Sequence, residues 1–114
     1  MQDVQAELNA LVRRELWTSF VGLLRSQLGA LQVTGRLNGV ELVESTLELE
    51  VNVRTSTAIL TIRFDAESGI GIWTEYKGRQ TIGSWSMTTG GSFAVDEQMM
   101  DMEFAVEYFA AKLV

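Results

Sequence analysis

The clearest pattern along the chain is the alternation of apolar and polar residues over residues 47–54 (LELEVNVR). A period of two residues is typical of a half-buried β-strand. The positions that would face inward are Leu47, Leu49, Val51 and Val53. Residues 58–64 continue this alternation after a Thr-Ser-Thr turn, and turn-forming residues separate two further segments, 70–76 and 80–87. We therefore expect strands throughout residues 31–87.

The connections between these segments are short, which favours antiparallel neighbours. Asn38-Gly39 lies between two short apolar segments and predicts a two-residue hairpin turn, because both turn positions need a positive φ angle. Residues 88–92 (TTGGS) end the strand region. The sequence thus predicts a five-stranded antiparallel meander.

Residues 3–28 have the spacing of a helix, with Gly29 as the predicted C-terminal stop. At about 100° per residue, the apolar residues fall on two faces roughly 150° apart. One face carries Val4, Leu8, Leu11 and Val12, and the other carries Trp17, Phe20, Val21, Leu24, Leu28 and Leu31. Either the helix breaks near residues 13–15, or one continuous helix presents two apolar faces and needs two surfaces to pack against.

A second helix is predicted over residues 95–112, again with two apolar stripes. The main stripe is Val95, Met99, Met102, Val106, Phe109 and Leu113. The second stripe lies roughly 160° away on the helical wheel and consists of Met100, Phe104, Tyr108 and Ala111. A contiguous exposed apolar stripe is uncommon on monomers, so the second stripe favours an intermolecular contact.

These elements predict a single α+β domain over residues 1–114, with both terminal helices packed on one face of the sheet. The order of elements is similar in topology to the frataxin-like fold and to small acidic secretion chaperones. No motif of either family is present, and the chaperones place a helix among their strands. The similarity therefore implies no activity.

The last predicted hairpin places two tryptophans on one face of the sheet. If residues 77–79 form a three-residue loop, Trp73 faces Gly83 and Trp85 faces Gly71, so each indole covers a glycine of the neighbouring strand. Burial in the core or in a dimer surface is the favoured interpretation, because large aromatic side chains are mostly buried.

The alternative is a ligand platform in a cleft between sheet and helices. It would consist of Trp73, Glu75, Tyr76 and Trp85, with Glu75 as the general base and Tyr76 as a proton donor. The opposite face of the same hairpin is semi-apolar, with Ile70, Ile72, Thr74, Tyr76, Ile82, Ser84 and Ser86. A sheet that is partly apolar on both faces favours an assembly over an isolated monomer.

The composition removes several kinds of chemistry. The chain contains no His, no Cys and no Pro, so imidazole and thiolate metal sites, disulfides and haem ligation by these residues are excluded. We expect no metal and no cofactor, and catalysis would depend on carboxylates, Lys, Tyr, Ser or Thr. The hydrophobic content is 46%, which argues against disorder.

The net charge is −6, with nine basic against fifteen acidic residues. This charge disfavours nucleic acid, which needs a cationic face. Residues 93–114 hold five acids against one lysine, a net charge of −4, so the acidity is concentrated at the C-terminal end. The N-terminus does not have the pattern of a signal peptide, and no apolar run reaches the ~20 residues of a membrane helix. We expect a cytoplasmic protein without membrane contact.

Two hypotheses follow from different functional classes. The first is a homodimeric interaction module, rather than an enzyme, that binds a basic or apolar polypeptide, as an immunity protein, an inhibitor or a chaperone does. Its predicted surface is Met100, Phe104, Tyr108, Asp96, Glu103 and Glu107. The second is a small-ligand binder or modest enzyme that uses the tryptophan platform.

Overall fold

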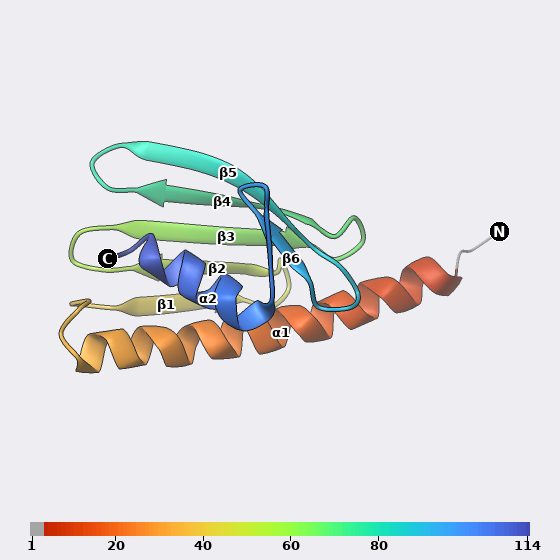
Figure 1. Cartoon of the computed structure of the whole chain (residues 1–114), viewed down its shortest axis with the longest axis horizontal. Coiled ribbons are helices and arrows are strands. Elements are labelled where there is room, and N and C mark those ends of the chain that lie inside the picture. Colours follow the sequence, from red (N-terminus) through yellow and green to blue (C-terminus); the bar gives the residue numbers. More distant parts are fainter. Residues whose placement is uncertain (1–3) are drawn as a thin grey trace.

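Two helices and seven strands make up the computed structural model, which describes residues 4–114 (Figure 1). The helices are α1 (Val4–Val33) and α2 (Met102–Ala111). The strands are β1 (Glu41–Ser45), β2 (Glu50–Arg54), β3 (Ile59–Asp65), β4 (Ile70–Tyr76), β5 (Gln80–Met87), β6 (Phe93–Val95) and β7 (Gln98–Met100). Each strand pairs antiparallel with the next in the order of the chain, so the predicted α+β meander is confirmed.

The sheet has two more strands than the five predicted. β6 ends at the first residue of the predicted last helix, and β7 lies within that predicted helix. β6 and β7 form a hairpin whose turn is Asp96-Glu97, with φ angles of 51° and 69°. Two successive positive φ angles are what a tight two-residue hairpin requires. Apolar spacing alone does not separate short strands from a helix, so the prediction of helix over residues 95–101 is wrong.

α2 begins at Met102 because its N-terminus is capped there. The side chain of Asp101 accepts a hydrogen bond of 2.8 Å from the backbone N–H of Phe104. Such a cap satisfies one of the backbone donors that have no partner within the helix. The stripe that packs on the core is therefore shorter than predicted, and its buried members are Val106, Phe109 and Leu113.

α1 is one continuous helix, so a break near residues 13–15 does not occur. The predicted first residue, Asp3, lies outside the described residues. The helix passes through Gly29, and the prediction of a stop there is wrong, because the buried stripe continues beyond it with Leu31 partly buried. The chain turns instead at Gly35, whose φ angle is 80°.

Two strand predictions before residue 50 are also wrong. Asn38-Gly39 lies in the connection between α1 and β1, because the helix extends over the segment that had been expected to form the first strand of a hairpin. Leu47 is exposed in the turn between β1 and β2 rather than facing inward. Leu49 is buried as predicted, although it lies in the turn with a φ angle of 48°.

The hairpin of β4 and β5 has the predicted register, with Trp73 opposite Gly83 and Trp85 opposite Gly71. A Cβ atom at either glycine would collide with the indole that lies over it. The two glycines therefore provide the space in which the indoles lie against the sheet. Both indoles belong to the core, with 4% of Trp73 and 2% of Trp85 exposed.

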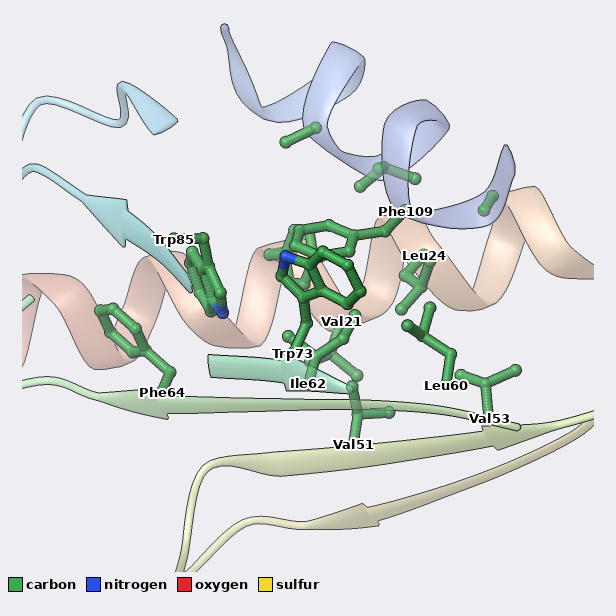
Figure 2. Close-up of a cluster of buried hydrophobic side chains, with 14 of the residues drawn as sticks. Val21, Leu24, Val51, Val53, Leu60, Ile62, Phe64, Trp73, Trp85 and Phe109 are labelled. Carbon is green, nitrogen blue, oxygen red and sulfur yellow. The ribbon is translucent and has the colours of Figure 1, made fainter. Parts of the chain in front are cut away.

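Both helices pack on the face of the sheet that carries the two indoles. Figure 2 shows Trp73, Trp85 and Phe64 projecting from the strands toward the helices. The Trp85 ring lies 4.9 Å from that of Phe64 and 6.0 Å from that of Phe20 in α1, centroid to centroid. Ile70, Ile72 and Ile82 project from the opposite face and are exposed.

α1 buries only one of its two apolar faces. The buried residues are Trp17, Phe20, Val21, Leu24 and Leu28. The exposed residues are Val4, Leu8, Leu11 and Val12, all in the first third of α1. Figure 1 shows the N-terminal end of α1 extending past the strands. The doubled periodicity of the sequence is therefore real, and one of the two faces of α1 stays exposed among residues 4–114.

Arg13 fastens the projecting part of α1 to the sheet. Its Nη1 donates to the carbonyl oxygens of Ala66 and Glu67, at 3.1 and 3.3 Å. Its Nε donates to the carbonyl oxygen of Met87 at 3.2 Å. One guanidinium thus joins the helix to the β3–β4 turn and to the end of β5. Hydrogen bonds from a charged donor such as this guanidinium are stronger than hydrogen bonds between neutral groups.

The first prediction concerns this contact. We expect R13K to lower the free energy of unfolding by about 1–3 kcal/mol, because a lysine amine cannot span carbonyls of two separate segments. Urea denaturation followed by tryptophan fluorescence measures the change. The control is R14K at the adjacent, exposed position, which should alter stability by less than about 0.5 kcal/mol. Equal losses in both variants would contradict the assignment.

The second prediction compares two glycines. G83A should destabilise the fold by about 1–3 kcal/mol or more, because the added methyl group displaces the Trp73 indole. G29A should instead stabilise it by about 0.5–1 kcal/mol, since alanine is the better helix former and a Cβ there meets nothing within 4 Å. Thermal unfolding by circular dichroism distinguishes the two. A destabilised G29A would mean that the helix ends at this glycine.

Candidate interaction surface

Asp96 is the centre of a polar cluster that joins β4, the β6–β7 turn and α2. The indole Nε1 of Trp73 donates to its Oδ1 at 3.1 Å. The hydroxyl of Tyr108 donates to its Oδ2 at 2.8 Å, and Nζ of Lys112 donates to the same oxygen at 3.2 Å. The left-handed conformation of Asp96 in the turn presents its carboxylate to all three donors. These residues lie 12 to 23 positions away in the sequence.

Lys112 completes the cluster by packing against two aromatic rings. Its Nζ lies 3.8 Å from the centroid of the Trp73 ring and 4.8 Å from that of Tyr108. A cation over the face of an aromatic ring is attracted by the negative potential of the ring. The ammonium group of Lys112 therefore contacts both the Asp96 carboxylate and the rings of Trp73 and Tyr108.

The electrostatics of the cluster favour an ionised carboxylate. Partial burial raises the pKa of Asp96, but hydrogen bonds from Tyr108, Lys112 and Trp73, together with the charge of Lys112, outweigh it and hold the pKa below its usual value. The hydrogen bond to Asp96 raises the pKa of Tyr108. Neither group is thereby tuned toward neutral pH as an acid–base catalyst would be, so the geometry is that of a structural clamp.

Two of the six predicted surface residues, Asp96 and Tyr108, are therefore engaged with each other. Phe104 points outward and is 53% exposed, while Met100 is partly buried and Met99 is the exposed methionine at 71%. The sequence predicts Met100 on the surface and Met99 in the core, and the structure shows the reverse. The reason is that both residues lie in β7, where neighbouring side chains point to opposite faces. We call Met99, Met100, Asp101 and Phe104, which line a shallow hollow of about 260 Å³, the C-terminal patch.

Glu103 and Glu107 face the neighbouring helix. They line a groove of about 250 Å³ between α1 and α2, together with Leu23, Ser26, Gln27 and Val106. We call this the α1–α2 groove. Its lining combines two carboxylates with the half-exposed side chain of Leu23. The predicted acidic residues thus lie beside the apolar patch, on the adjacent side of the same helix.

The residues of the predicted ligand platform do not share a surface. Trp73 and Trp85 are buried among aromatic side chains. Glu75 and Tyr76 are adjacent in a strand and so point to opposite faces of the sheet. The Glu75 carboxylate lies 3.9 Å from Nζ of Lys77. A hollow of about 540 Å³ lies instead under the start of α1, lined by Ala6, Glu7, Ala10, Leu11, Arg14 and Glu67.

Sequence reasoning missed Lys112 and Met99. Lys112 was counted only as a charge of the last helix, and no local spacing links it to Asp96 sixteen residues earlier. The apolar spacing predicts Met99 in the buried stripe of a helix, because this spacing gives no sign of the β6–β7 turn. An Asp-Glu pair between segments 93–95 and 98–100 was the available signal, but it is weaker than Asn-Gly.

Within residues 4–114, no group of three or more acidic side chains is arranged to hold a metal ion. No helix in that range is long and apolar enough to cross a membrane. We also compared the chain with protein-family models, with curated proteins and with solved structures, and none of them gives a significant match.

The third prediction follows from the lowered pKa of Asp96. Because the folded state holds this carboxylate ionised more firmly than the unfolded state does, the cluster stabilises the fold above about pH 4 and loses its contribution as the pH falls further. D96N should lower the free energy of unfolding at pH 7 by about 1–3 kcal/mol.

The pH dependence provides the test. The difference between wild type and D96N in denaturant titrations should shrink below about pH 4, since both then lack the charge. E97Q, at the neighbouring exposed position, is the control and should show a small difference at every pH. A D96N difference that is as large at pH 3 as at pH 7 would rule out the ionised carboxylate as its cause.

Proposed function

We propose that this protein is a small, acidic, cytoplasmic, homodimeric interaction module that binds another polypeptide. The observation that carries the proposal is the exposure of Phe104 and Met99 beside the carboxylates of the α1–α2 groove. An exposed aromatic ring and methionine in a shallow hollow are typical of protein-binding surfaces. This is the class to which immunity proteins, inhibitors and chaperones belong.

The chemistry of the surface defines the kind of partner. Phe104 and Met99 supply apolar anchors, and the flexible thioether of methionine adapts to different side chains. Glu103 and Glu107 attract basic residues and disfavour acidic ones. The expected partner therefore presents an apolar side chain flanked by Lys or Arg.

The Asp96 cluster supports this surface by holding it in one conformation. It joins the β6–β7 turn, which precedes the C-terminal patch in the sequence, to Tyr108 and Lys112, which follow it. A binding surface that is ordered before binding loses less conformational entropy in the complex. Asp96 and Tyr108 would thus act as positioning residues rather than as contacts.

No observation favours the alternative of a ligand platform. Its two indoles are buried, and its proposed base and donor point to opposite faces of the sheet. The polar groups beside Trp73 are Asp96, Tyr108 and Lys112, and they are already hydrogen-bonded to one another. The interaction module therefore accounts better for the exposed residues.

The fourth prediction tests the partner chemistry with an array of synthetic peptides in which an apolar residue is flanked by lysines, and a matched set flanked by glutamates. The wild-type protein should retain the lysine set preferentially. F104S should weaken this binding by roughly tenfold or more, as expected when a central aromatic anchor is removed. E103Q with E107Q should reduce both the preference for lysine and the sensitivity to salt.

V43S is the matched control, because Val43 is exposed on β1, on the opposite face of the sheet. It should bind like the wild type, and circular dichroism should show that every variant is folded. Equal retention of the two peptide sets, or equal losses in F104S and V43S, would refute the proposed surface.

A further inference from the structure

One edge of the sheet is open in its middle. β5 pairs with β4 over Gln80–Ser86, but on its other side β6 pairs only with Trp85–Met87. We call Gln80–Ser84 the free edge. Gln80, Thr81, Ile82 and Ser84 are exposed, and Gly83 is partly buried. Figure 1 shows this half of β5 at the margin of the sheet, away from both helices.

The free edge lacks the devices that protect other edge strands. β1, at the other margin, carries Glu41 and Glu44, and Glu44 lies 3.6 Å from Arg25 of α1. α1 also reaches the start of that edge, because the Gln32 side chain accepts a hydrogen bond from the Val40 N–H at 2.9 Å. The free edge has the sequence QTIGS, without charge or proline. Unprotected edges of this kind are templates for the addition of another strand.

The surroundings of the free edge indicate which strand is added. None of the outward residues of β4 and β5 is charged; they are Ile70, Ile72, Thr74, Tyr76, Gln80, Ile82, Ser84 and Ser86. Ile82 is 63% exposed at the margin of this surface. Two copies of a chain with a net charge of −6 repel each other least where such an uncharged surface meets its own copy.

We propose that a second copy of this chain pairs antiparallel with the free edge, around a two-fold axis at Ile82. This inference rests on the homodimer in the proposed function and assigns its interface. In this register each Ile82 lies opposite its counterpart, Thr81 lies opposite Gly83 of the second copy, and Gln80 lies opposite Ser84. The two sheets become one continuous sheet, and the isoleucine pair is buried on its uncovered face.

Charge complementarity supports this register at both ends of the paired segment. Ser84 is the last residue of the free edge, and the next residue, Trp85, is opposite Val95, just before the Asp96-Glu97 turn. The register brings the 77–79 loop of the second copy toward this acidic turn, where Arg79 and Glu97 are exposed. Lys77 and Asp96 already have partners within their own chain. The two-fold axis repeats the contact at the other end. Opposite charges at the rim fix register and orientation.

The absence of cysteine makes a direct test possible. I82C introduces the only thiol of the chain, and the two-fold axis places two copies of it opposite each other. Opposed residues in antiparallel strands have Cα atoms about 4.5–5.5 Å apart, within the range that a disulfide spans. We expect I82C to form a disulfide-linked dimer rapidly under mild oxidation, as seen on a non-reducing gel.

I72C is the matched control, because Ile72 is similarly exposed on the same face but lies on β4, one strand away from the edge. It should remain unlinked under the same conditions. A second pair of variants needs no oxidation. I82K should be a monomer by light scattering at about 100 µM, because the two-fold axis would place its two lysines opposite each other. The wild type and I72K should be dimers at the same concentration.

The outcomes separate this inference from the proposed function. A disulfide at I82C together with a monomeric I82K supports the edge-paired dimer. A dimer that survives I82K and forms a disulfide through I72C instead would overturn the edge pairing and leave a dimer that packs face to face. A wild type that is monomeric at this concentration would overturn both the edge pairing and the homodimer, whereas the peptide array tests the C-terminal patch independently.

Discussion

The two indole–glycine pairs of the β4–β5 hairpin decide which face of the sheet becomes the core. Trp73 over Gly83 and Trp85 over Gly71 place two of the largest apolar side chains on one face. Both helices must cover that face, since burial of this area supplies a large share of the driving force for folding. Neither α1 nor α2 lies on the other face, and the isoleucines of that face stay exposed. The isoleucine face is thus exposed because the core forms on the face that carries the two indoles.

The aromatic core also explains the polar cluster beside it. The indole N–H groups of Trp17 and Trp85 are buried and have no hydrogen-bond partner among residues 4–114, at a cost of about 1–3 kcal/mol each. Trp73 avoids this cost because Asp96 accepts from its Nε1, and the left-handed conformation that Asp96 adopts in the β6–β7 turn presents its carboxylate to the indole. The charge of the Asp96 carboxylate is in turn balanced by the Tyr108 hydroxyl of α2 and by the ammonium group of Lys112, the residue after α2. Core packing therefore sets the geometry of the C-terminal patch.

The parts of the fold that could be predicted are those specified by local chemistry. The register of β4 and β5 follows from a glycine-containing loop and from the glycines that the indoles require, all within seventeen residues. The β6–β7 hairpin could not be predicted, because Asp-Glu is a weak turn signal and the apolar spacing also fits a helix. The Asp96 cluster was beyond prediction for a different reason: its donors come from residues 73, 108 and 112, and only the tertiary fold brings them together. The two faces of α1 were visible as periodicity, although periodicity does not say which face is buried.

The distribution of charge connects the two proposed surfaces. The acidic groups of α2 lie on the helical side of the sheet, whereas the uncharged residues of β4 and β5 face the other side. A two-fold axis between antiparallel strands of one sheet runs perpendicular to that sheet, so it keeps the helical sides of both copies on the same side. The edge-paired dimer would therefore present two C-terminal patches in the same direction. A partner with two basic and apolar segments could then bind both patches at once, and the second contact would form at the high effective concentration set by the first. Dimerisation through an uncharged edge would thus leave the acidic surfaces free and double their number, which would raise the overall affinity of a contact that is weak on its own.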